Sequence, residues 1–152
     1  MAIAITLHLL AVVVWIGGMF FAHHALRPVA AALLEPPHRL PLWVGVFKRF
    51  FVWVWISVIV LPATGYWMIF SVFGGFAYVG LYIHIMNLIG LIMIGLFIFV
   101  FFSPYQQLKT EVAANNYPEA AKKLALIRKI VVTNLNLGLL NVCIASLGRY
   151  WS

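Results

Sequence analysis

Four long runs of apolar residues, separated by segments that hold nearly all of the charged residues, set the pattern of this chain. Each run reaches the roughly 20 residues that an α-helix needs to cross the hydrocarbon core of a bilayer. The pattern therefore predicts an all-α integral membrane protein, a four-helix bundle in which residues 1–152 form a single transmembrane domain. The predicted spans are residues 2–25, 50–72, 78–102 and 130–147, and the two long connections are residues 27–49 and 103–129.

Prolines and polar residues divide the connections into predicted turns and helices. In the first connection, Glu35-Pro36-Pro37 and Pro41 are expected to break helix and to favour extended or turn structure. In the third, Gln106–Val112 is expected to extend the third span, and Pro118 to open a helix that runs into the fourth. Residues 73–77 form a short second connection that contains two glycines.

Composition excludes a soluble globular domain, because 65% of the residues are hydrophobic and only 9% are charged, against about a quarter in ordinary domains. The net charge of +7 does not indicate nucleic acid, since the basic residues gather in the first and third connections. The second connection has none, so the positive-inside rule predicts that both termini face outward. We expect a multi-pass protein of the bacterial inner membrane, with the lipid bilayer as its partner and no nucleic acid.

Two histidines, His8 and His84, are the ionisable side chains that fall well inside the predicted spans. An ionisable residue in a lipid span is costly and by default indicates a functional site. Each lies about six residues after the predicted outer start of its span, which corresponds to roughly 9 Å of depth. Two imidazoles at matched depth on different helices predict a metal ion or a haem iron held between them.

The helical period indicates which residues share a face with each histidine. Trp15 lies on the stripe of His8 and is expected to pack on the edge of a flat macrocycle, and Asn87 lies on the stripe of His84. In the alternative interpretation each histidine only hydrogen-bonds across helices, His84 through Asn87 or Asn141. The stripes are Ala4, Ala11, Trp15, Met19 and Ala22 around His8, and Gly80, Asn87, Leu88, Leu91 and Gly95 around His84.

The remaining residues disfavour several other kinds of site. The spans contain no Asp or Glu, which argues against transport through a buried carboxylate relay. Cys143 is the single cysteine, so the chain has no thiolate pair for copper or zinc. His23 and His24 are expected at the cytoplasmic interface, without a facing histidine for a second haem. No nucleophile–base pair lies within the spans, so catalytic residues stay unknown.

Short motifs occur along essentially the whole chain. They are His8-Leu9-Leu10-Ala11-Val12-Val13-Val14-Trp15-Ile16-Gly17-Gly18-Met19, Phe47-Lys48-Arg49-Phe50, Ala63-Thr64-Gly65-Tyr66-Trp67, Tyr82-Ile83-His84, Pro104-Tyr105 and Asn134-Leu135-Asn136-Leu137-Gly138-Leu139-Leu140. With the first of these motifs, the first span resembles the opening helix of the CopD-type copper-resistance membrane proteins and, more distantly, of the HemJ-type protoporphyrinogen oxidases. The first likeness implies a four-helix membrane core and copper uptake or tolerance. The second implies haem b, with His8 and His84 as functional positions, although Met86 stands where that family has lysine.

The leading hypothesis from the sequence is a small haem b protein whose iron lies between His8 and His84, near the periplasmic side. Bis-imidazole ligation fills both axial positions of the iron and favours electron transfer, with quinone or another redox protein as the exchange partner. Arg149 is expected to offset propionate charge. The residues expected around the cofactor are Trp15, Asn87, Asn141 and Arg149.

Two other hypotheses stay open at this stage. The first is a copper uptake or tolerance protein that uses His8, His84 and a methionine such as Met68. The second is an accessory subunit without a cofactor, in which the polar residues of the spans only hold helices together. The sequence also leaves open whether the bundle acts alone, as a homo-oligomer or within a larger membrane complex.

Overall fold

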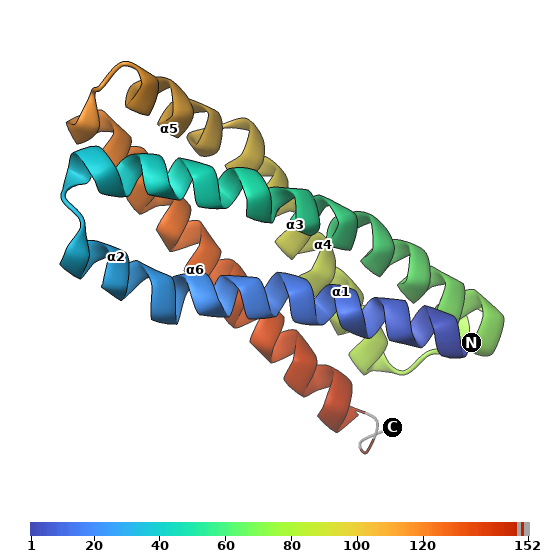
Figure 1. The fold of residues 1–152 in the computed structure, drawn as a ribbon. Coiled ribbons are helices and arrows are strands. Elements are labelled where there is room, and N and C mark those ends of the chain that lie inside the picture. Colours follow the sequence, from blue (N-terminus) through green and yellow to red (C-terminus); the bar gives the residue numbers. More distant parts are fainter. Residues whose placement is uncertain (149, 151–152) are drawn as a thin grey trace.

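The chain folds into long helices joined by short turns, and no strand occurs in residues 1–148 and 150, which the structure describes (Figure 1). This computed structural model confirms the predicted all-α class. Four helical stretches are long and apolar enough to cross a membrane, as predicted. The elements are α1 (Ala2–Phe21), the π-helix η1 (Ala22–Leu26), α2 (Arg27–Leu33), α3 (Pro36–Val72), the 3₁₀-helix η2 (Phe76–Tyr78), α4 (Leu81–Phe102), α5 (Pro104–Ala113) and α6 (Tyr117–Gly148).

The helices extend well beyond the predicted spans. α3 has 37 residues and α6 has 32, so at 1.5 Å per residue they are about 55 Å and 48 Å long. The hydrocarbon core of a bilayer is only about 30 Å thick. Each of these helices therefore has an N-terminal part outside the apolar span, and much of the predicted connections is helical.

The predicted break at Glu35-Pro36-Pro37 is confirmed, because α2 ends at Leu33 and both Leu34 and Glu35 have extended backbone. The predicted break at Pro41 is wrong, since the same prolines begin a long helix that runs through it. Pro36 and Pro37 occupy the first positions of α3 after Glu35, whose backbone is extended. The amide hydrogen that proline lacks would have no partner in the first turn, so proline is tolerated there. Pro41 and Pro62 both lie inside α3. The turn between α2 and α3 is consequently reduced to Leu34 and Glu35.

The third connection contains a helix of its own. Ser103 leaves the helical region of backbone conformation and Pro104 begins α5, because a residue that precedes proline disfavours the α conformation. Gln106–Val112 is thus helical as predicted, but in a separate element that packs along α6. The prediction that a helix opens at Pro118 is confirmed within one residue, since α6 begins at Tyr117.

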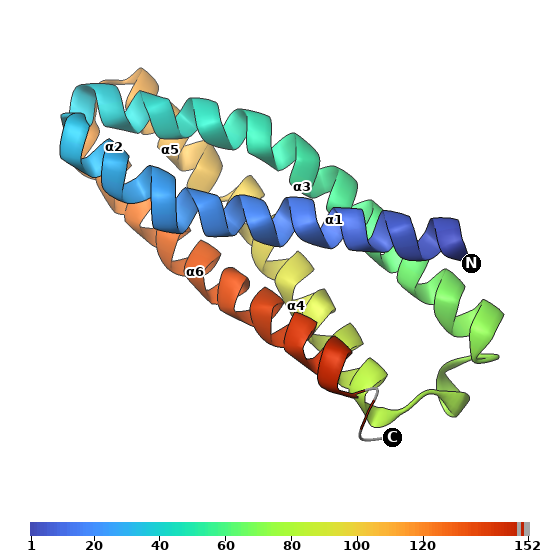
Figure 2. The ribbon, with the colours of Figure 1, turned by 60° about the horizontal axis from the view of Figure 1, so that its bottom comes forward.

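The helices are arranged as two packed groups. α1 packs along α3, whereas α4 and α5 pack along α6. Figure 2 shows that the α1–α3 pair and the α4–α6 pair lie close together at the end that holds α2 and α5. The two pairs diverge toward the opposite end, where α1 begins and α6 ends. We call this the His8 end of the bundle, and the other the Arg128 end.

An aromatic core joins the two groups. Phe97 of α4 is 4% exposed, and its ring contacts Trp15 of α1 at a centroid distance of 6.3 Å and Phe51 of α3 at 5.4 Å. Trp55 of α3 and Phe101 of α4 complete its surroundings, at 5.1 Å and 6.1 Å. Phe97 therefore joins the α4 group to both helices of the α1–α3 pair.

Polar and small residues of α6 hold α4 in place. Asn134 donates a hydrogen bond to the Met93 carbonyl at 3.3 Å. At Gly138, one turn further along, a Cβ atom would lie only 3.1 Å from Met93 Cε of α4. Small residues allow this close approach of helices in lipid, where an interhelical hydrogen bond contributes about 0.6 kcal/mol.

Candidate metal site

His8 lies on the inward face of α1, as the helical period predicts. Ala11, Trp15 and Met19 of its stripe are all buried, and His8 itself is partly buried near the N-terminal end of the helix. Its Nδ1 atom lies 2.8 Å from Thr64 Oγ1 of α3. The imidazole is thus fixed by a neighbouring helix.

The hydroxyl of Thr64 determines which nitrogen of His8 carries the hydrogen. Thr64 has one hydroxyl hydrogen, and its Oγ1 atom lies 2.6 Å from the Val60 carbonyl, to which it donates. The hydroxyl oxygen is then left as an acceptor, and the His8 tautomer that satisfies both hydrogen bonds carries its hydrogen on Nδ1. A neutral imidazole with its hydrogen on Nδ1 has its lone pair on Nε2. Such an arrangement, with one ring nitrogen hydrogen-bonded and the other free to coordinate, is typical of metal-binding histidines.

The sequence of α3 allows the helix to pass close to the imidazole. A Cβ atom added at Gly65 would lie 3.5 Å from His8 Cε1, which is ordinary contact distance. A longer side chain at this position would compete with the ring for space. Thr64 and Gly65 together therefore form the wall against which His8 lies.

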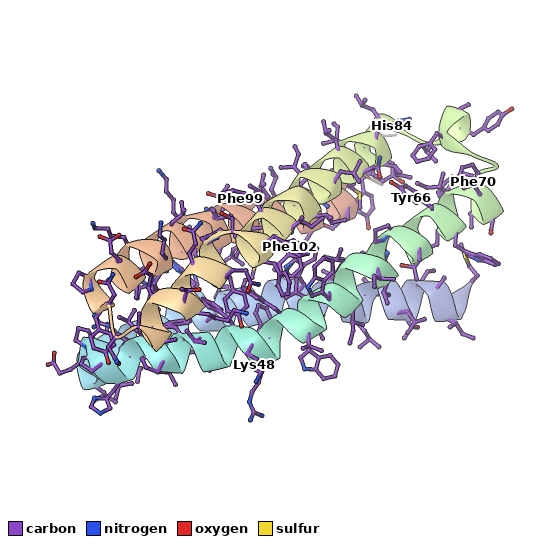
Figure 3. All side chains as sticks on the ribbon, turned by 90° about the horizontal axis from the view of Figure 1, so that it is seen from above. Lys48, Tyr66, Phe70, His84, Phe99 and Phe102 are labelled. Atoms are coloured by element: carbon purple, nitrogen blue, oxygen red, sulfur yellow. The ribbon has the colours of Figure 1, made fainter. Side chains whose placement is uncertain are left out.

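His84 lies at the same end of the bundle but in different surroundings. Figure 3 labels it near the start of α4, at the same end of the bundle as Tyr66 and Phe70 of α3. Its ring is 5.9 Å from that of Phe76, which in turn lies 5.9 Å from the ring of Tyr66. The side chain of His84 is exposed. Phe76 thus lies between His84 and α3, and no hydrogen bond or ring contact joins His84 to His8 within the described residues.

The predicted depth match holds only in part. His8 comes six residues after the start of α1 at Ala2, but His84 comes three residues after the start of α4 at Leu81. At 1.5 Å per residue these positions correspond to about 9 Å and 4.5 Å along the helices. The difference arises because residues 76–78 form a 3₁₀ turn and Gly80, with extended backbone, precedes α4.

The predicted inward stripe of α4 is wrong. Leu88 and Leu91, which share a face with His84, are 60% and 48% exposed. The buried face consists of Ile89, Met93, Phe97 and Val100. The reason is that α4 is apolar around its whole circumference, so the period does not indicate a face, and the packing of its bulky residues against α6 and the aromatic core decides it.

The other residues predicted around a cofactor serve different purposes or lie elsewhere. Trp15 packs in the aromatic core against Phe97. Asn141 donates to the Met86 carbonyl at 3.3 Å and not to His84. Asn87 is partly exposed on α4. Arg149 lies outside the described residues.

The His8 end offers neutral ligand atoms. The chain has three acidic residues, and Glu35, Glu111 and Glu119 lie in or beside α2, α5 and the start of α6, at the Arg128 end. Within the described residues no group of three or more His, Cys, Asp or Glu side chains is placed to hold a metal ion. Any metal at the His8 end would thus bind one or two imidazoles without a carboxylate.

Sequence reasoning missed Thr64 and Phe76. Thr64 appears in the chain only as one polar residue between Ala63 and Gly65, and its contact with His8 depends on how α1 and α3 pack. Phe76 follows Gly74 and Gly75, whose φ angles of 76° and 126° favour glycine. A signal for Phe76 existed in that glycine turn, which returns the chain toward α3.

Comparison with protein families gives one match: the model of copper resistance protein D matches residues 44–147. The matched part is more than half of the chain and includes most of α3, all of α4 and α5, and α6 except its last residue. The chain belongs to the CopD family. This confirms the first of the two resemblances found in the sequence, and a multi-pass location in the bacterial inner membrane fits both the family and the four apolar helices.

The family match includes one of the two histidines and not the other. His84 lies inside the matched part of this CopD protein, whereas α1, with His8 and Trp15, precedes it. The likeness to HemJ-type proteins is not supported by these comparisons. The chain matches no curated protein and no solved structure. The haem b hypothesis therefore has no support from the family, and copper becomes the better supported ligand.

Proposed function

We propose that this CopD protein handles copper at the His8 end of the bundle, in copper uptake or tolerance, with His8 as a ligand. The family match supports copper as the metal. The observation that carries the site is the hydrogen bond between His8 and Thr64, which leaves the lone pair of Nε2 available. Imidazole nitrogen is a good ligand for copper.

The electrostatics of the His8 end support the same choice of metal. Neutral imidazoles without a carboxylate do not suit magnesium, calcium or manganese, which prefer oxygen ligands. They suit copper, and monovalent copper adds only a single charge to an apolar environment. This bundle end contains no acidic residue to neutralise a higher charge.

His84 is the second ligand in this proposal. It reaches the His8 end from α4, which belongs to the other helix pair, so copper would be held between the two groups of helices. Phe76 lies between His84 and α3, and it follows the Gly74-Gly75 turn. A change of this turn would bring His84 nearer to His8.

The cellular test compares copper content in cells that produce the wild type, the His8→Ala variant or no such protein. We expect the wild type to change the copper content measured by mass spectrometry, and the variant to match the cells without the protein. Immunoblots of the membrane fraction control for the amount of protein. A variant that changes copper content as fully as the wild type would contradict the proposal.

Replacement of Thr64 by valine tests the role of the hydroxyl. The substitution keeps the shape of the side chain and removes the acceptor that holds His8 Nδ1, so copper affinity is expected to fall about 10- to 100-fold, as for other residues that orient metal ligands. Competition with a chromogenic copper(I) chelator measures it.

Thr6→Val is the matched control for this experiment. Thr6 lies on α1 near His8, is exposed, and its hydroxyl donates to the Ala2 carbonyl within its own helix. Its replacement is expected to leave copper affinity unchanged. An equal loss in both variants would show that the effect does not come from the orientation of His8.

A further inference from the structure

The Arg128 end of the bundle gathers three arginines from three different elements. Arg27 begins α2, Arg39 lies in the first turns of α3, and Arg128 lies in α6 where its apolar part begins. The charges of Arg27 and Arg39 both act on Arg128. We call these three residues the arginine cluster, and it is independent of the proposed copper site.

The arginine cluster has no anionic partner in the described part of the chain. The ion pair in the described residues joins Lys122 and Glu119, two exposed residues of α6 that lie outside the cluster. Arg39 Nη1 makes a long contact of 3.5 Å with the Leu34 carbonyl. Among the described residues no carboxylate lies within ion-pair distance of the three guanidinium groups, so their mutual repulsion is unfavourable in partly buried surroundings.

Three buried N–H groups at this end lack a hydrogen-bond acceptor. They are Nε of Arg39, Nε of Arg128 and Nε1 of Trp43, all buried and without a partner. The Trp43 ring also lies under the guanidinium of Arg128, with 6.0 Å from Cζ to the ring centroid. A buried donor without a partner costs about 1–3 kcal/mol. The donors and the charges thus require the same kind of ligand, an anion with several acceptor oxygens.

A small cavity lies beside Trp43 and Arg128, and Arg27 also lines it. Its volume is about 20 Å³, enough for one water-sized group. Arg27 is exposed, so the cluster reaches the surface. The cavity has room for a single oxygen atom of a larger anion, and the rest of that anion would remain at the surface. The residues that line it are Ala22, His23, Arg27, Trp43, Phe47, Arg128 and Val131.

The local backbone beside the cavity is irregular. Residues 22–26 form the π-helix η1, which carries His23 and His24. π-helical turns inside long helices are rare and occur frequently at functional sites. Here η1 follows α1 directly and leads into α2, so it places His23 in the cavity wall and Arg27 beside it.

We propose that the arginine cluster, with Trp43 Nε1, is a binding site for a phosphate group. Guanidinium groups present paired N–H donors that match phosphate oxygens. Basic pockets between transmembrane helices bind the headgroups of anionic lipids. The phosphate group would therefore belong to an anionic phospholipid, with free phosphate as the other source of the same chemistry. The bound group would neutralise the repulsion and supply acceptors to the unpaired donors.

The test uses the full-length protein, delipidated in maltoside detergent, and follows its melting temperature. Phosphatidylglycerol is titrated in one series and inorganic phosphate at constant ionic strength in another. We expect a saturable stabilisation in at least one series. In the Arg39→Gln/Arg128→Gln variant the midpoint of that titration is expected to rise about tenfold or more, since hydrogen bonds to charged groups are lost.

Arg49→Gln is the matched control, because Arg49 lies on α3 like Arg39 but is exposed. It is expected to leave the midpoint unchanged. Arg27→Gln serves as a second test variant, because Arg27 is exposed and its replacement does not disturb the packing. Its midpoint is expected to rise as well.

Each outcome decides the question. Saturation by phosphatidylglycerol that inorganic phosphate does not reproduce identifies a lipid headgroup as the ligand. Saturation by inorganic phosphate alone identifies free phosphate. The absence of stabilisation in both series, or the same midpoint in wild type, Arg27→Gln and Arg39→Gln/Arg128→Gln, overturns the proposal.

Discussion

The copper(I) affinity of the purified protein is expected to fall about 100-fold or more when His8 is replaced by alanine. Loss of a group that merely orients a metal ligand costs about 10- to 100-fold in affinity, so loss of the ligand itself costs at least as much. Competition with a chromogenic copper(I) chelator under anaerobic conditions measures the effect. The His84→Ala variant is expected to show a loss of similar size, because His84 is the second ligand in the proposal.

His24→Ala is the control for this measurement. His24 is exposed on η1 at the Arg128 end, where its ring packs against Phe20 at 4.5 Å, and it shares no contact with His8. Its replacement is expected to leave copper affinity unchanged. If His8→Ala binds copper as tightly as His24→Ala, the ligand set lies elsewhere in the chain.

Among the substitutions proposed for this protein, replacement of Phe97 by alanine is expected to lower the free energy of unfolding most. Phe97 is 4% exposed and contacts four aromatic rings from α1, α3 and α4. Truncation of a buried phenylalanine costs about 3–5 kcal/mol through lost contacts and the cavity left behind. Because this residue joins the two groups of helices, thermal unfolding in detergent is expected to occur at a clearly lower temperature.

Phe99→Ala provides the comparison on the same helix. Phe99 lies two residues further along α4 and is 49% exposed (Figure 3), so its side chain contacts lipid or detergent more than protein. Its replacement is expected to change the free energy of unfolding by no more than about 0.5 kcal/mol. Equal destabilisation by the two substitutions would contradict the assigned packing of α4.

The inward face of α1 was predictable from sequence, and that of α4 was not. On α1 the stripe of His8 includes Ala11, Trp15 and Met19, all of which are buried. On α4 the residues are apolar on every side, so the hydrophobic pattern does not show which face meets the partner helices. Which face of α4 is buried depends on packing against distant parts of the chain, mainly at Phe97. This packing leaves His84 exposed at the surface.

The residues that meet at the two ends of the bundle could not be predicted from the sequence, because the helices extend beyond the apolar spans. Pro36 and Pro37 follow the predicted break, but they also begin α3, which places Arg39 in a helix that packs against α6. From the sequence, Arg27, Arg39 and Arg128 are only scattered basic residues of two connections. The fold brings them together, as it brings Thr64 to His8.

The measurement that tests the central proposal most directly is metal analysis and optical absorption of the wild-type protein, purified in detergent after growth with copper and haem. The proposal predicts copper in a fixed ratio to protein, reduced in His8→Ala, with no Soret band. A Soret band with a b-type reduced spectrum that is lost in His8→Ala would restore haem as the ligand. A protein that retains no copper would contradict the proposed function.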